Sequence, residues 1–472
     1  MTLTSINQAR PFVAASAARA SAPAEQSAPS GDSFTLSNNQ PPAQQPPAQQ
    51  PPAQQPPAQQ PPAQQQPPTQ PQPPQQPPAP PQPELKEWTV LVYSVSDNNL
   101  YSYMQEDLNE AERVGSTEQM TVLAETSHQP RGGSVVRMKL ETNDTPGLTS
   151  PVLTDLGKTH DMAKSDSMAD AIAWAMKEYP SKHFAVVVSD HGGGWQGANH
   201  SESTDSWMNV SDLEAGFKKA QELTGKKVDV IGFDECLMAS TEVAHALQGC
   251  ADYMVASEEV EGGAGWQYDQ SLGGAKSSNS NSRVLSGKML NFAATALRSR
   301  DPLTPESFAK GIVQMAEGHQ RDLGTMSALD LNKFGAVSAA VDNFAGVVLD
   351  SNLGKADFAP VAAATQKFYR FADLGHFVDL ASTRFGGAIA EAGAGVKQAM
   401  SEAVVANQHS TKYPNAQGLN IELNKQAAFV EQGPADVPNL EPRDKDRMNM
   451  APYKDQKFAA ETRWDEMLRK VR

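Results

Sequence analysis

The sequence has few cysteines and no long apolar run. Only Cys236 and Cys250 occur among its 472 residues, and neither has the CxxC or Cys/His spacing that binds zinc. This excludes a disulfide framework beyond one bridge and leaves a cysteine thiol open to a nucleophilic role. No run of 18 apolar residues is present, so the sequence excludes a membrane-spanning helix.

Positive charge is also scarce. The chain carries 39 Lys and Arg residues against 55 Asp and Glu residues, a formal net charge of −16. Such a charge argues against non-specific binding to nucleic acid and against attraction to anionic lipid surfaces. We therefore expect no nucleic-acid partner, whereas an enzyme of this charge would attract cationic substrates.

Proline is abundant but confined. Of 35 prolines, 20 lie between Pro41 and Pro83, where five consecutive PPAQQ repeats precede looser Pro/Gln repeats. This composition buries almost nothing and favours polyproline II, so we predict a disordered arm over 1–85, a semi-rigid spacer in preference to a proline-motif ligand. Residues 11–18 form only a broken apolar stretch where a Sec signal peptide has a continuous one. We expect a cytoplasmic location or export by a non-Sec route.

From Trp88 onward, strand and helix patterns alternate. Strand patterns occur at 88–93, 120–125, 135–140, 184–188, 228–233 and 253–257, and helical patterns at 100–111, 168–179, 213–223 and 237–249. This alternation predicts an α/β sandwich with a mostly parallel central sheet and a C-terminal helical extension. We place the catalytic core at 86–270, a mixed helical part with a late strand at 271–430, and a polar tail with a terminal helix at 431–472.

Two chemically capable residues follow two of these strands. His191 begins the glycine run of SDHGGGW, and Cys236 lies in FDECLMAS at a strand-to-helix turn. Ligand and catalytic groups collect beyond the carboxyl ends of parallel strands, so the imidazole and the thiol can meet if the two strands are neighbours. A following helix would favour the thiolate, and the glycines can aim N–H groups at an oxyanion. Each residue taken alone also fits a simple turn or a buried apolar cysteine.

The longer motifs resemble a known family. SDHGGGW, FDECLMASTEVA and VASEEVEGGAGWQY are similar to the clostripain family of cysteine peptidases, relatives of caspases, gingipains and legumains. The likeness runs from about Trp88 to Leu423 and includes EWTVLVYSVSDNNL near its start and NAQGLNIEL near its end. The resemblance implies a caspase-like fold and an endopeptidase that cleaves after Arg or Lys.

The resemblance also implies roles for single residues. It makes His191 the general base and Cys236 the nucleophile, and it places the oxyanion hole at the backbone N–H groups of Gly192 and Cys236. Asp234 would bind the basic side chain of the substrate, and a carboxylate suits Arg or Lys. We expect Trp195 and Trp266 to shape the substrate cleft, although aromatic residues beside glycine turns are as typical of plain packing.

Alternatives of other classes share these motifs. A transpeptidase or ligase of the same fold would use the same catalytic residues, and a catalytically silent interaction protein would keep the scaffold. The expected partners are proteins or peptides containing Arg or Lys, and the expected state is a monomer. The chemistry needs no cofactor; the resemblance implies Ca²⁺ as an activator, but no EF-hand loop places a calcium site.

Two positions depart from the family pattern. Glu235 stands where a small residue such as alanine is more common, and its carboxylate either faces away, as strand alternation indicates, or alters the specificity pocket. The segment 199–210, in which family members are often self-cleaved after a basic residue, contains no Lys or Arg. We therefore predict either no processing there or cleavage at Lys226 or Lys227.

Overall fold

A computed structural model describes most of the chain after the proline-rich repeats. It covers residues 85–129, 132–263, 265–266, 268, 289–298, 303–316, 324–423 and 452–472. The predicted arm, 1–85, lies outside the described residues apart from Leu85, and so does the part of the predicted tail before residue 452. Residues 80–472 form one compact unit.

A nine-stranded sheet forms the centre of this unit, in the order β13-β10-β9-β8-β5-β1-β2-β3-β4. Strands β9, β8, β5, β1 and β2 run parallel to one another, and the outer strands pair antiparallel. The sheet strands are β1 (Lys86–Ser94), β2 (Met120–Ser127), β3 (Val135–Lys139), β4 (Val152–Gly157), β5 (Ser181–Ser189), β8 (Val228–Asp234), β9 (Ala251–Ala256), β10 (Thr325–Asp330) and β13 (Val404–His409). Two smaller sheets contain β6 (Ala198–Ser201) with β7 (Ser206–Met208), and β11 (Lys367–Phe368), β12 (Phe371–Asp373) and β14 (Asn420–Ile421).

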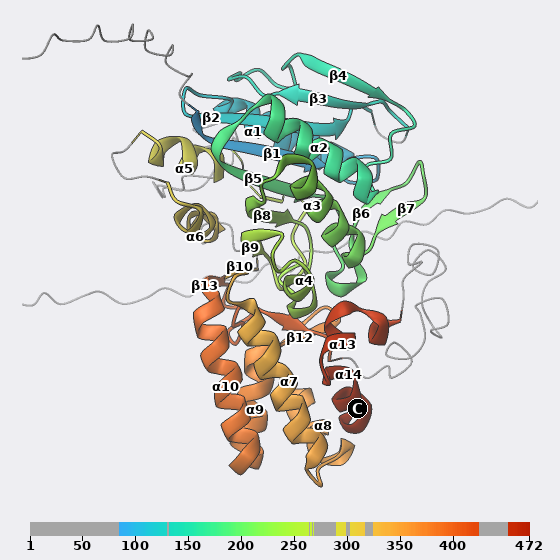
Figure 1. The fold of residues 1–472 in the computed structure, drawn as a ribbon, viewed down its shortest axis with the longest axis vertical. Helices are drawn as coiled ribbons and strands as arrows, with labels where there is room; N and C mark the ends of the chain where they lie inside the picture. The colour runs from blue at the N-terminus through green and yellow to red at the C-terminus, as the bar shows by residue number, and fades with distance from the viewer. Residues whose placement is uncertain are drawn as a thin grey trace, which may run out of the picture. The chain divides into compact units, whose positions relative to one another are not determined.

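Helices surround the sheet, as Figure 1 shows. They are α1 (Tyr101–Val114), α2 (Ser165–Glu178), α3 (Val210–Thr224), α4 (Thr241–Ala246), α5 (Met289–Ala296), α6 (Pro305–Ala316), α7 (Phe334–Asp350), α8 (Lys355–Ala364), α9 (Leu374–Phe385), α10 (Gly387–Ala403), α13 (Lys457–Glu461) and α14 (Trp464–Val471). None of the helices in the described part of the chain is both long and apolar enough to cross a membrane.

Alternation along the strands explains why helices cover both faces. In β1, Leu91 and Tyr93 belong to the core cluster that contains α2, α3, α4 and α7. Val90 and Val92, which point to the opposite face, belong to the cluster that contains α1, α5 and α6. Strands buried on both faces read as continuous apolar runs, and the predicted α/β sandwich with a mostly parallel sheet is confirmed.

The C-terminal helices continue this core. α7 packs against α4, α10 and α14, and β10 and β13 extend the same central sheet beyond β9. The orange helix α10 of Figure 1 therefore contacts β10 and β13, at one end of the sheet.

Candidate active site

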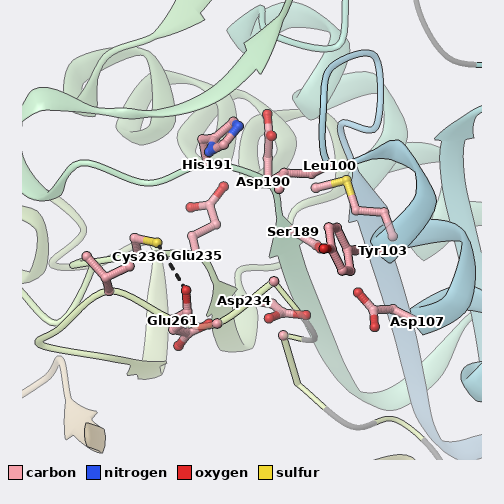
Figure 2. A pocket seen from close by; sticks show the side chains of 15 residues that line it. Leu100, Tyr103, Asp107, Ser189, Asp190, His191, Asp234, Glu235, Cys236 and Glu261 are labelled. Carbon is pink, nitrogen blue, oxygen red and sulfur yellow. Dashed lines mark hydrogen bonds between the residues drawn. The ribbon is translucent and has the colours of Figure 1, made fainter. Parts of the chain in front are cut away.

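The strand register brings His191 and Cys236 to the same sheet edge. β5 and β8 are parallel neighbours, and Ser189 pairs with Asp234 at their carboxyl ends. His191 and Cys236 each follow two residues later, and both line a cavity of about 260 Å³. Figure 2 shows the imidazole and the thiol on the same side of this cavity, with Glu235 between them.

Gly192 allows the two catalytic loops to touch. A Cβ atom at Gly192 would lie 2.4 Å from the carbonyl oxygen of Cys236 and 2.9 Å from Cβ of Glu235. Real side chains do not approach a backbone oxygen so closely, so the His191 loop can rest on the Cys236 turn only if residue 192 is glycine. Position 194 favours glycine for another reason, since its φ of 62° lies in the left-handed region, which residues with a Cβ atom rarely adopt.

Asn99 orients the imidazole. Its side-chain oxygen Oδ1 lies 2.9 Å from Nε2 of His191. Asn99 follows β1, the other strand beside β5, and so stands at the same sheet edge. In the tautomer that donates to Asn99, the basic nitrogen of His191 is Nδ1.

Asp190 anchors the loop that carries His191. Its Oδ1 accepts a hydrogen bond from Nδ2 of Asn98 at 2.6 Å, its Oδ2 accepts one from the backbone N–H of His200, and the N–H of His191 also donates to it. Burial raises the pKa of Asp190 well above its ordinary value. The Asp190 side chain thus joins the ends of β1, β5 and β6.

Cys236 stands in a turn and not at the start of a helix. α4 begins only at Thr241, and Leu237 has a φ of 69°. The helix predicted over 237–249 is therefore wrong at its beginning, and a helix dipole that acts within about one turn does not reach the thiol. Burial and the nearby Glu261 carboxyl raise the pKa of Cys236 to about 12. The resting residue is a neutral thiol, whose Sγ lies 3.8 Å from the carbonyl oxygen of Glu261.

Buried carboxyl groups form the floor of the cavity. Asp234 accepts hydrogen bonds from the hydroxyl of Tyr268 at 2.8 Å and from the backbone N–H of Trp266 at 2.9 Å. Burial raises the pKa of Asp234 to about 6. The pKa values of Asp107 and Glu261 are raised well above their ordinary values by burial and then by the charge of Asp234. No Lys or Arg is among the described residues that line the cavity.

Glu235 points away from Asp234. Figure 2 shows its side chain directed toward His191 and Asp190, as strand alternation predicts. The residue is 1% exposed, and burial, then the charge of Asp190, raises its pKa well above the ordinary value. The extra carboxyl of this chain therefore lies beside His191 in surroundings that disfavour its charged form.

The two tryptophans lie behind the cavity and not in its wall. Trp195 is 1% exposed; its Nε1 donates to Oε2 of Glu422 at 2.9 Å, and its ring meets the Tyr453 ring edge-to-face with centroids 5.0 Å apart. Trp266 is also buried, and its Nε1 donates to Oε1 of Glu261 at 3.4 Å. Neither tryptophan is among the residues that line the cavity. Their burial fits plain packing, and the Trp266 indole supports the carboxyl group of Glu261.

Sequence reasoning did not identify Asn99, Asp107, Glu261 or Tyr268 as site residues. Asn99 had a usable signal, since SDNN follows β1 at the edge where His191 and Cys236 lie. Asp107 lies within α1, and its approach to Asp234 depends on tertiary packing.

A metal ion has no evident place in the described residues. There, no three His, Cys, Asp or Glu side chains are grouped so that they could hold one. The implied calcium activation therefore has no site to which we assign it.

Comparison with known proteins agrees with this architecture. Residues 92–470 match the clostripain family, peptidase family C11. Clostripain from Hathewaya histolytica is 24% identical over 306 residues, 54% of this chain and 55% of the relative, so the chain spans just over half the length of that relative.

Two solved structures share the fold. A secreted C11 cysteine protease from Bacteroides thetaiotaomicron, in complex with an irreversible peptide inhibitor, has a TM-score of 0.53 and 19% identity over 72% of this chain and 94% of that one. An inactive zymogen C11 protease from Parabacteroides distasonis has a TM-score of 0.55 and 20% identity over 80% and 99%. Because the family match covers most of the sequence, this chain belongs to the clostripain family.

Proposed function

We propose that the protein is a cysteine endopeptidase that cleaves peptide bonds after Arg or Lys, with Cys236 as nucleophile and His191 as general base and acid. The support is a single cavity that holds a thiol, an imidazole and buried carboxyls without a lining Lys or Arg. Family membership is consistent with this chemistry.

The acidic floor suits a cationic side chain. Burial raises the pKa values of Asp107, Asp234 and Glu261, and the charge of Asp234 raises those of Asp107 and Glu261 further, so the charged forms are disfavoured. A guanidinium or ammonium group entering the cavity would stabilise the ionised carboxylates and lower these pKa values. Arg can pair with Asp234 through two parallel hydrogen bonds, whereas Lys acts as a point charge.

The same event would activate the nucleophile. The pKa of Cys236 is raised by burial and then by carboxyl groups, so a substrate cation that neutralises those carboxylates lowers the thiol pKa. Proton transfer to His191 then produces the thiolate–imidazolium pair. Substrates without a basic side chain would leave Cys236 as a thiol, which makes selection part of the chemical step.

The reaction proceeds through a thioester. The Cys236 sulfur attacks the carbonyl carbon that follows the basic residue, while the N–H groups of Gly192 and Cys236 donate to the oxyanion. The C–N bond breaks, and the His191 imidazolium protonates the leaving amine. His191 then removes a proton from water, which attacks the thioester and releases the acid and the free thiol.

An Arg-ended fluorogenic peptide tests the proposal. We expect cleavage by the unmodified chain and a loss of at least about 10³-fold for Cys236→Ala, with Cys250→Ala as a control that keeps activity. Labelling by an Arg chloromethyl ketone at Cys236 separates a peptidase from a silent interaction protein, which should not react. Transfer of the acyl group to an added amine in preference to water would indicate a transpeptidase, and retained cleavage by Cys236→Ala would contradict the assignment.

A further inference from the structure

A short C-terminal strand runs beside the turn that carries Cys236. β14 lies in the motif NAQGLNIEL, for which neither the sequence nor the proposed mechanism supplies a role. The backbone N–H of Asn420 donates to the carbonyl of Ala239 at 2.8 Å, and its carbonyl accepts from the Thr241 hydroxyl at 2.9 Å. The strand therefore forms hydrogen bonds on either side of Ser240, four residues after the nucleophile.

The residue after the nucleophile has an unusual backbone conformation. Leu237 has a φ of 69°, a left-handed conformation that residues with side chains rarely adopt and that the surrounding structure must hold. Its N–H donates to the carbonyl of Glu259 at 3.2 Å, and its carbonyl accepts from Nδ2 of Asn420 at 2.9 Å. The Asn420 amide is thus a direct restraint on this turn.

The same amide also holds the segment that supplies Val260 and Glu261 to the cavity lining. Nδ2 of Asn420 also donates to the carbonyl of Glu258 at 2.9 Å, and the segment after Glu258 supplies Val260 and Glu261 to the cavity lining. Asn420 is fully buried, so water has no access to replace either bond. One side chain links the Cys236 turn to the Glu261 loop, whose carbonyl contacts Sγ.

Glu422, two residues after Asn420, holds the His191 loop. Oε2 of Glu422 accepts the indole N–H of Trp195 at 2.9 Å, and the backbone N–H of Glu422 donates to Glu242 at 3.0 Å. Trp195 belongs to the glycine loop that begins at His191. Residues 420 and 422 therefore contact the Cys236 turn and the His191 loop from one short segment.

We propose that Asn420 is a positioning residue for the nucleophile, and that the segment 420–422, which begins with β14, fixes the thiol relative to the imidazole through Asn420 and Glu422. The inference rests on the proposed roles of Cys236 and His191. It makes the C-terminal part of the chain a component of the catalytic site, although no side chain of β14 lines the cavity.

Asn420→Asp tests the role of the amide, because it leaves the shape of the side chain almost unchanged. It replaces the NH₂ group that donates to the two carbonyls with an oxygen that can only accept. Asn407→Ala is the control: it removes an amide hydrogen bond, to the carbonyl of Ala416 at 3.0 Å, at an exposed residue outside the cavity lining. We expect kcat for the Arg peptide to fall at least tenfold in Asn420→Asp with KM within threefold, and both constants to stay within twofold in Asn407→Ala.

Alkylation of Cys236 by iodoacetamide separates positioning from the peptidase proposal, because it needs no substrate. Mass spectrometry of the Cys236 peptide across pH 5–10 should show about tenfold slower reaction near pH 7 in Asn420→Asp than in Asn407→Ala, since displacement of the thiol away from His191 lowers the small fraction of thiolate that exists without substrate. Equal alkylation profiles in the two variants would overturn the inference even if peptide cleavage stands. Absence of cleavage with distinct alkylation profiles would instead contradict only the peptidase assignment.

Thr241→Val covers the case in which Asn420 variants do not fold. This change keeps the side-chain shape and removes only the bond from Thr241 to the Asn420 carbonyl. We expect kcat to fall at least threefold while thermal unfolding remains a single transition. An unchanged kcat would overturn the inference.

Discussion

Burial raises the pKa of Asp234, and the charge of a bound substrate would lower it. Its pKa of about 6 is raised mainly by burial, against the hydrogen bonds from Tyr268 and Trp266 that favour the ionised form. A proton and a substrate cation compete for this carboxylate. As pH falls through about 6, the proton wins, so binding of basic substrates weakens on the acid side.

We therefore predict that KM for an Arg peptide rises as pH falls from 7 to 5. Asp234→Asn should remove this rise and increase KM at pH 7 by about 10-fold to 100-fold, because a charge-assisted hydrogen bond contributes about 1.5–3 kcal/mol. Initial rates across pH for both proteins measure the effect. Asp252→Asn, at an ion pair with Lys227 outside the cavity, should keep the unmodified profile, and a persistent acid-side rise in Asp234→Asn would assign the proton to another group.

The position of His191 and Cys236 at one sheet edge could be predicted because its signals are local. His191 and Cys236 both follow strongly apolar strands, and the parallel order of β5 and β8 places them together. The state of the thiol could not be predicted this way. The raised pKa of Cys236 depends on burial and then on Glu261, which is 25 residues away and approaches only in the folded chain.

At the scale of elements, the contact between the His191 loop and the Cys236 turn determines how the imidazole and the thiol are placed relative to each other. The His191 loop rests on the Cys236 turn at Gly192, where a Cβ atom would meet a backbone oxygen. Backbone groups cannot move aside as a flexible side chain can, so a substituent must separate the loops.

Gly192→Ala is predicted to reduce kcat/KM at least about 100-fold, since displacement of the reacting groups by about 1 Å has effects of this size. Gly193→Ala is the matched control, because its added Cβ would lie no closer than 3.4 Å to its nearest neighbour, Cβ of Gln196. Steady-state kinetics and circular dichroism of both variants test this. Equal activities would mean that the loops can separate without loss.

Helices and strands could be predicted where the local apolar pattern determines the backbone. They could not be predicted where a residue far away in the sequence holds the backbone conformation. β1, β2, β5 and β8 match their predicted strands. The turn after Cys236 was assigned to a helix because its side chains have helical spacing, whereas the Asn420 amide, 183 residues from Leu237, satisfies a left-handed backbone. β10 similarly gains its place by pairing with β9 and β13.

At the scale of the whole molecule, the end of the described chain closes onto the core that supports the site. Trp464 in α14 is fully buried, its Nε1 donates to the carbonyl of Glu422 at 3.0 Å, and its ring meets Phe377 edge-to-face at 5.9 Å. Glu422 in turn binds Trp195. A continuous set of contacts therefore runs from α14 through the β14 segment to the His191 loop.

We predict that Trp464→Ala lowers the free energy of unfolding by about 3–5 kcal/mol, as expected for removal of a buried aromatic side chain. Arg469→Ala, which removes a partly exposed ion pair with Asp465 on the same helix, should cost about 1 kcal/mol or less. Urea titrations followed by circular dichroism and by residual peptide cleavage measure both. Because α14 and the catalytic loops share Glu422, activity and secondary structure should be lost at the same urea concentration; activity that outlasts the unfolding of the C-terminal helices would show that the catalytic core stands without them.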